Sequence, residues 1–167
     1  RRDIHEEYEF KRAQRLGKKM IGICRGSQFL CVMAGGKLIQ HQSYQPYLHT
    51  MRVLDKKNKI LISSTHHQAQ FPFNLDRKEY KIIGWTEGLS QIHQGADHVE
   101  MFPDVECEIV YYPEICALGI QGHPEKLKDD RDIWSRKFEK EEALSNEIKE
   151  TLDYCNELVN KLLDNKF

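Results

Sequence analysis

The sequence has no long apolar run and no surplus of charge of either sign. None of its apolar stretches approaches the roughly 20 residues that a membrane-spanning helix needs, so we expect no membrane segment. Its 25 lysines and arginines nearly balance 26 aspartates and glutamates, and the two signs are interspersed, which gives a formal net charge of −1. Because no basic patch is available to attract phosphate groups, we expect no nucleic-acid partner.

A disulfide framework is also lacking. Five cysteines, an odd number spread over 167 residues, do not have the pattern of a small secreted disulfide protein. No charged-then-apolar leader opens the chain, and we therefore expect a reducing, cytoplasmic location. The length, with 40% hydrophobic and 31% charged residues, predicts one globular domain.

Helical and strand patterns alternate along the first 128 residues, as in an α/β fold. Helices are expected over residues 4–16, closed by Gly17, and over residues 28–34, closed by a glycine pair. A surface loop is expected over residues 43–47. Strands are expected over residues 20–23, 37–41, 50–54, 59–63, 80–85, 106–111 and 117–120, with a hairpin formed by residues 50–54 and 59–63. Because the chain starts at Arg1, inside the first predicted helix and not at a methionine, the pattern is consistent with a domain whose N-terminal strands lie upstream.

From residue 129 onward the sequence is charged, lacks glycine and proline, and is typical of helices. Its apolar positions recur every three or four residues, which predicts one apolar stripe along a helix. These positions are Leu144, Ile148, Leu152, Cys155, Val159 and Leu162. We expect residues 129–167 to form helices packed on the domain of residues 1–128. A coiled-coil partner site is the less favoured alternative, since the heptad pattern lasts barely three repeats.

Cys24 lies on a predicted turn from a strand into a helix. Gly22 and Gly26 flank it, and glycine relieves the crowding of such a strained turn. The dipole of the following helix favours thiolate over thiol, and the Arg25 cation would lower the pKa of the sulfur further. The alternatives are a buried structural cysteine and an arginine that forms ion pairs elsewhere.

A thiol nucleophile needs a base, and that base needs an acceptor that orients its ring. His123 follows the predicted strand of residues 117–120, at a strand end from which side chains can reach a neighbouring turn. Pro124 pushes the preceding His123 into an extended conformation, so His123 and Glu125 can project to the same side. The sequence therefore predicts a triad of Cys24, His123 and Glu125.

The other candidate residues have ordinary structural explanations. His66 and His67 are neighbours that would point to opposite faces of a strand, and no second pair with metal-ligand spacing accompanies them. We therefore expect no metal site and no cofactor. The remaining cysteines lie in apolar patterns that are typical of core packing: Cys31, Cys107, Cys116 and Cys155.

These motifs together resemble the class I glutamine amidotransferase family, including its γ-glutamyl hydrolase branch, which is γ-glutamyl-GABA hydrolase-like. The likeness is carried by Gly-Ile-Cys-Arg-Gly-Ser-Gln at residues 22–28 and Gly-His-Pro-Glu at residues 122–125. Between them, Ser-Thr-His-His-Gln at residues 64–68 is most similar to the γ-glutamyl hydrolase branch. The resemblance spans residues 1–125. It implies a flavodoxin-like, three-layer α/β fold with a mainly parallel, mixed sheet flanked by helices.

The resemblance also implies roles for individual residues. Cys24 would attack the γ-carboxamide carbon of glutamine or a γ-glutamyl amide, His123 would move the proton, and Glu125 would orient His123. The backbone N–H of Arg25, in the same turn as Gly26, would hold the oxyanion together with a donor from a glycine-rich loop earlier in the fold. The remaining implied contacts, to the amino and carboxylate ends of the glutamyl group, would come from Gln28 and from the backbone around Thr65 and His66.

Three functions remain open at this stage. The first is glutaminase activity that passes ammonia to a synthetase acting in trans as a separate partner. The second is hydrolysis of γ-glutamyl amines or peptides, which needs no synthetase and which Arg25 and the segment at residues 64–68 favour somewhat. The third is a non-catalytic binding or regulatory module that retains the triad.

Overall fold

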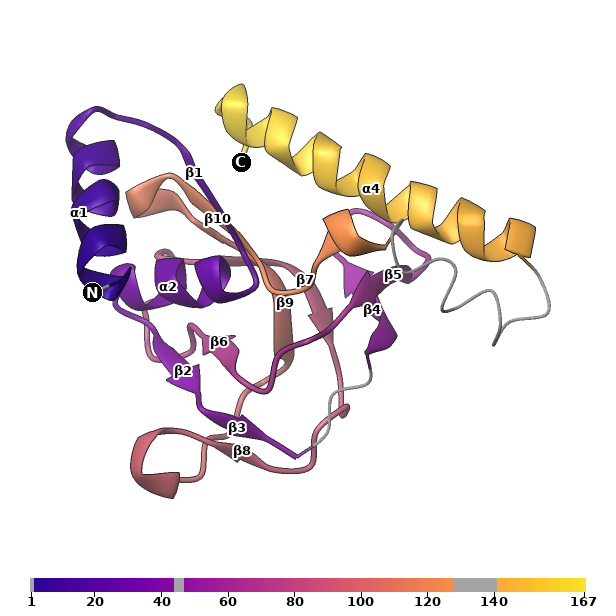
Figure 1. Cartoon of the computed structure of the whole chain (residues 1–167), viewed down its shortest axis with the longest axis horizontal. Coiled ribbons are helices and arrows are strands. Elements are labelled where there is room, and N and C mark those ends of the chain that lie inside the picture. Colours follow the sequence, from indigo (N-terminus) through magenta and orange to yellow (C-terminus); the bar gives the residue numbers. More distant parts are fainter. Residues whose placement is uncertain (1, 44–46, 128–140) are drawn as a thin grey trace.

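The computed structural model describes residues 2–43, 47–127 and 141–167. The loop expected over residues 43–47 therefore falls mostly outside the described residues. The same is true of the beginning of the C-terminal helical section expected from residue 129. Figure 1 shows a central sheet with helices on both faces and two small sheets beside it.

The central sheet has six strands. One pair of neighbouring strands is parallel, and every other pair of neighbours in this sheet is antiparallel. In spatial order these strands are β1 (Met20–Ile23), β10 (Ala117–Ile120), β9 (Glu106–Tyr112), β7 (Lys81–Thr86), β4 (Leu48–Val53) and β5 (Ile60–Ser63). The two small sheets are antiparallel pairs, β2 (Lys37–Ile39) with β6 (Ala69–Phe71) and β3 (His41–Gln42) with β8 (His93–Gln94).

The predicted α/β fold with a mixed sheet flanked by helices is confirmed, but the parallel share of the described strands is smaller than expected. Only β1 and β10 pair in parallel among the six strands described above. β4 and β5 are joined by a short turn, and β9 is joined to β10 through the short helix η2 (Pro113–Ile115). Such short connections produce antiparallel neighbours, because a parallel pair needs a longer crossover.

Two helices cover the two faces of the central sheet (Figure 1). On one face, α4 (Glu141–Leu163) packs Tyr154 and Leu158 against a core that contains Met51, Ile62 and Ile109. On the other face, α2 (Arg25–Met33) packs Cys31 into a second core with Cys107, Val110 and Tyr112. These two apolar layers hold α4 and α2 against the sheet, and Cys24 directly precedes α2.

A third helix, α1 (Arg2–Arg15), packs loosely beside α2. Phe10 is its one buried residue, and the ring of Phe10 meets Phe29 edge to face at a centroid distance of 6.1 Å. Gly17 follows α1 with a φ of 59°, a left-handed conformation that suits glycine at a helix end. None of the helices in the described part of the chain is both long and apolar enough to cross a bilayer.

Most of the predicted elements are present with small shifts of their ends. The strands expected over residues 20–23 and 117–120 match β1 and β10, and the expected hairpin is β4 with β5. The strand expected over residues 37–41 is divided into β2 and β3, and α2 begins three residues earlier than expected, directly after Cys24. The apolar stripe of α4 is confirmed by four buried positions, Leu144, Ile148, Cys155 and Leu162. The short strands β6 and β8 were not predicted.

Candidate active site

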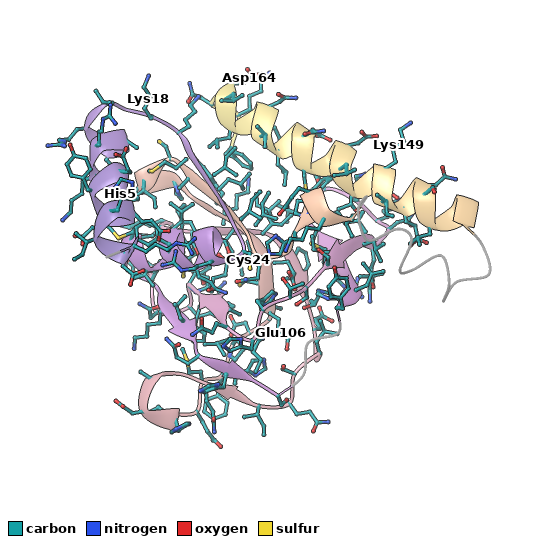
Figure 2. The ribbon with its side chains drawn as sticks, in the orientation of Figure 1. His5, Lys18, Cys24, Glu106, Lys149 and Asp164 are labelled. Carbon is teal, nitrogen blue, oxygen red and sulfur yellow. The ribbon has the colours of Figure 1, made fainter. Side chains whose placement is uncertain are left out.

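Cys24 lies at the point where β1 passes into α2, near the middle of the molecule (Figure 2). Its backbone has φ 52° and ψ −109°, a conformation that residues with side chains rarely adopt. The Cys24 N–H donates to the carbonyl of Ile120 at 2.8 Å, while its own carbonyl accepts from the N–H groups of Ser27 and Gln28. The strained turn is therefore tied both to β10 and to the first turn of α2.

Of the two glycines beside Cys24, only Gly22 is required for space. A Cβ atom at Gly22 would lie 2.3 Å from the carbonyl oxygen of Gly26 and 2.8 Å from a methyl carbon of Leu30. A Cβ atom at Gly26 would have no atom within 4 Å. The close approach of β1 to α2 thus depends on the glycine that precedes the cysteine, whereas the second glycine is not needed to relieve crowding.

His123 lies at the same edge of the sheet as Cys24. β1 and β10 run in parallel with Ile23 opposite Ile120, so the chain leaves both strands at one end. His123 then begins the short helix η3 (Pro124–Lys126), and its Nδ1 lies 2.6 Å from Oε1 of Glu125. A carboxylate can only accept a hydrogen bond, so the Nδ1 carries the proton and the Nε2 of a neutral ring is left as the basic nitrogen.

The sulfur and the ring are not hydrogen-bonded to each other. Among the hydrogen bonds of the described residues, none joins Cys24 Sγ to the imidazole of His123. Contacts between a nucleophile and its base are often long without substrate and shorten when substrate binds. The fold places the Cys24 thiol and the His123 imidazole at the same edge of the sheet.

The pKa of the Cys24 thiol is raised. This corrects the expectation that the helix dipole and the Arg25 cation lower it. Burial is the largest cause, because it disfavours the charged thiolate. A hydrogen bond from the backbone N–H of Arg25 and the positive charge of Lys126 act in the opposite direction, and the charge of Glu125 adds to the rise. The thiol of the free protein therefore needs a base to ionise it efficiently near neutral pH.

The side chain of Arg25 is held by α1. Its guanidinium donates to both carboxylate oxygens of Glu6, at 2.7 Å and 2.5 Å, and to Asp3. This pairing raises the pKa of Arg25 and lowers that of Glu6. The ion-pair alternative for Arg25 is the one observed, so its contribution beside Cys24 comes from the backbone N–H and not from the cation.

The segment of residues 64–68 is fixed to α2 through one carbonyl oxygen. The Gln68 carbonyl accepts hydrogen bonds of 2.8 Å from Nε2 of Gln28 and from Nδ1 of His66. Burial lowers the pKa of His66, and its Nε2 is buried with no hydrogen-bond partner in the described part of the chain. Thr65 is exposed on the same segment. Gln28 and His66 thus hold the segment in place, and Thr65 faces solvent from it.

Two residues of this region escaped the sequence reasoning. Ser63 binds the backbone of His123 through its hydroxyl, and Lys126 is a positive charge near the sulfur. Lys126 could have been noticed, since it directly follows the Gly-His-Pro-Glu motif. Nothing in the sequence distinguishes Ser63 from other serines that end a strand.

Replacing Lys126 by glutamine should raise the pKa of Cys24 further, because it removes a positive charge that favours the thiolate. The pH profile of Cys24 alkylation by iodoacetamide would then move to higher pH relative to the unmodified protein. Lys166→Gln at the distant C-terminus is the matched control and should leave the profile in place. A profile for Lys126→Gln that does not move, or moves to lower pH, would contradict this electrostatic role.

Comparison with known proteins identifies the family and the fold. A family model described as Peptidase C26 matches residues 1–125. A glutamine amidotransferase from Thermotoga maritima has a similar structure, with a TM-score of 0.53 and 16% identity over 96% of this chain. A glutamine amidotransferase from Methylobacillus flagellatus has a TM-score of 0.50 and 14% identity over 79% of this chain. The chain spans 68% of the first protein and 48% of the second, and no curated protein matches it.

Proposed function

Since the chain belongs to the Peptidase C26 family and has the fold of glutamine amidotransferases, we propose that it hydrolyses γ-glutamyl amides with Cys24 as nucleophile. The observation that supports this most strongly is the bond between His123 Nδ1 and Glu125, which leaves Nε2 as a base at the edge of the sheet where Cys24 emerges. The reaction class, amide hydrolysis by a cysteine, agrees with the family as a whole.

The first half of the proposed reaction forms an acyl-enzyme. His123 Nε2 takes the proton of the Cys24 thiol, and the thiolate attacks the γ-carbonyl carbon of the substrate. The carbonyl oxygen becomes an oxyanion, which the backbone N–H of Arg25, with Gly26 in the same turn, faces at the start of α2. The protonated His123 then gives its proton to the departing nitrogen, the C–N bond breaks, and a γ-glutamyl thioester remains on Cys24.

The second half of the reaction returns the enzyme to its starting state. The neutral His123 takes a proton from a water molecule, which attacks the thioester carbonyl. The C–S bond breaks, the sulfur recovers a proton from His123, and the glutamyl group leaves as a free acid. Glu125 accepts from Nδ1 throughout, so it stabilises the imidazolium that forms in each half.

The segment of residues 64–68 is the proposed wall of the glutamyl pocket. Gln28 and His66 fix this segment through the Gln68 carbonyl, and Thr65 is exposed on it. The backbone groups of Thr65 and His66 on this segment would then contact the amino and carboxylate ends of the glutamyl substrate. In this proposal Gln28 and His66 contribute by holding the wall, and Thr65 lines it.

The proposal includes two kinds of substrate, which differ in their leaving group. With glutamine the product is ammonia, which a separate synthetase partner would consume. With γ-glutamyl amines or peptides the product is an amine and no partner is needed, an alternative that the description of the family as a peptidase favours. Steady-state assays with glutamine, γ-glutamyl amines and γ-glutamyl peptides, with and without candidate synthetases, distinguish the two. No turnover of any of these substrates by a protein that contains both motifs would point to a non-catalytic binding module.

Glu125→Gln should reduce kcat, but the fold-loss should be about 100 times smaller than the loss caused by removing the nucleophile. The amide weakens the orientation of His123 and the stabilisation of the imidazolium, yet both reacting groups remain present. The measurement is kcat against pH for the variant and for Glu114→Gln, an exposed carboxylate near β10 that should have no effect. A kcat of Glu125→Gln equal to that of the unmodified protein would reject Glu125 as the partner of His123.

A further inference from the structure

The hydroxyl of Ser63 forms two hydrogen bonds with the backbone of one residue, His123. Ser63 Oγ accepts from the His123 N–H at 3.1 Å and donates to the His123 carbonyl at 2.9 Å. Ser63 is the last residue of β5, and it is 1% exposed. The two contacts are partly buried, and the His123 carbonyl also accepts from the Lys126 N–H at 3.1 Å. Loss of the Ser63 hydroxyl would therefore cost the His123 N–H its partner in a partly buried place.

The two segments that this hydroxyl joins are far apart in the sheet. β5 is at one end of the strand order, and three strands separate it from β10, which leads to His123. The sheet is nevertheless curled, so that η3 lies next to β5 (Figure 1). Ser63 is thus a side-chain link between β5 and the segment that follows β10, two strands that are not direct neighbours in the sheet.

Gly122 makes this link possible by letting the chain pass close to β5. A Cβ atom at Gly122 would lie 2.4 Å from Cγ1 of Ile62 and 2.4 Å from the carbonyl oxygen of Ser63. Any side chain there would push the segment away from β5 and carry His123 out of reach of the hydroxyl. The glycine and the serine therefore act together to set where the His123 backbone lies.

The position of the His123 ring follows from the position of its backbone. The ring is already constrained at Nδ1 by Glu125, and Glu125 is on the same short helix, so it moves with His123. Glu125 is also half exposed, with a side-chain exposure of 51%, and cannot by itself fix the ring relative to β1. A contact from outside η3 is needed for that, and Ser63, which is itself buried, provides one.

We propose that Ser63 is a positioning residue that sets the distance between the His123 imidazole and Cys24. This inference rests on the proposed function and deepens it. Because β5 continues directly into the segment of residues 64–68, the same strand supports both the base and the proposed wall of the glutamyl pocket. The role requires the hydroxyl and not merely the volume of the side chain.

The test compares Ser63→Ala with Thr151→Val. Thr151 is 0% exposed, and its hydroxyl donates to the carbonyl of Leu61 at 2.6 Å, so it is also a buried hydroxyl that holds β5. Both variants should lower the melting temperature. Only Ser63→Ala should lower kcat, by about 10- to 100-fold for an ångström-scale displacement of the base, with KM little changed. Its pH profile of kcat should shift, while Thr151→Val keeps the kcat, KM and profile of the unmodified protein.

The outcomes separate this inference from the proposed function. Equal kcat for Ser63→Ala and Thr151→Val would reduce Ser63 to a structural residue and overturn the inference, even where Cys24→Ala is inactive. Full activity of Cys24→Ala would overturn the proposed function and the role of Ser63 with it. If Ser63→Ala does not fold, Ser63→Cys keeps the approximate volume with a weaker donor. A reduced kcat for that variant supports the role, and an unchanged kcat overturns it.

Discussion

Replacing Cys24 by alanine should lower kcat for hydrolysis of a γ-glutamyl amide by at least about 10⁴-fold and leave the domain folded. The nucleophile of the proposed mechanism is then absent, and neither His123 nor the N–H of Arg25 can form an acyl bond. Alanine adopts the unusual φ of 52° at this position no less readily than cysteine, so the turn should keep its shape. The measurement is the rate of glutamate release, with circular dichroism to verify the fold.

Cys116→Ala is the matched control for this substitution. Cys116 was expected to pack in the core, but it is an exposed free cysteine. It also has a positive φ, 48°, so both variants replace a thiol by a methyl group at a residue with left-handed backbone. Cys116→Ala should retain full activity, and His123→Ala should be as inactive as Cys24→Ala because the two residues act as a unit. Turnover by Cys24→Ala at the rate of Cys116→Ala would reject the triad.

Gly22→Ala should destabilise the turn and abolish most activity. Its Cβ would lie 2.3 Å from the carbonyl oxygen of Gly26, and a backbone atom cannot rotate away as a flexible side chain can. Overpacking of this kind typically costs about 1–3 kcal/mol and sometimes more. A shift of the turn by an ångström would also displace Cys24 and cost on the order of 100-fold in kcat. Thermal unfolding and steady-state kinetics measure the two effects.

Gly26→Ala tests the same argument from the other side of the cysteine. A Cβ at Gly26 meets no atom within 4 Å, so this variant should fold with nearly unchanged stability. The sequence alone gives the two glycines of the motif equal weight, whereas the structure separates them. Equal stability losses for Gly22→Ala and Gly26→Ala would contradict the close approach of β1 to α2.

The positions of Cys24 and His123 could be predicted because they depend on local pattern. Each follows a short apolar strand that ends in a turn, and strands followed by such turns are readable from periodicity and glycine. The pairing of β1 with β10 brings the two ends to one edge, which is the step that turns two motifs into one candidate site. The hydrogen bond between His123 and Glu125 was likewise predictable from the intervening proline.

The missed features depend on tertiary contacts. The partners of Arg25 lie 19 and 22 residues earlier on another helix, and the direction of the Cys24 pKa follows from burial that only packing determines. The strands β6 and β8 have three and two residues, too few for a periodic pattern to show. The contact of Ser63 with His123 requires the curl of the sheet, which no local signal encodes.

The most direct test of Cys24 as nucleophile is reaction with a glutamine-analogue electrophile, followed by mass spectrometry of the peptides. The account predicts a single adduct, on Cys24 and on none of the other four cysteines, formed more slowly when a γ-glutamyl substrate is present and absent in His123→Ala. Modification of another cysteine instead, or continued turnover by a protein in which Cys24 is fully blocked, would contradict it.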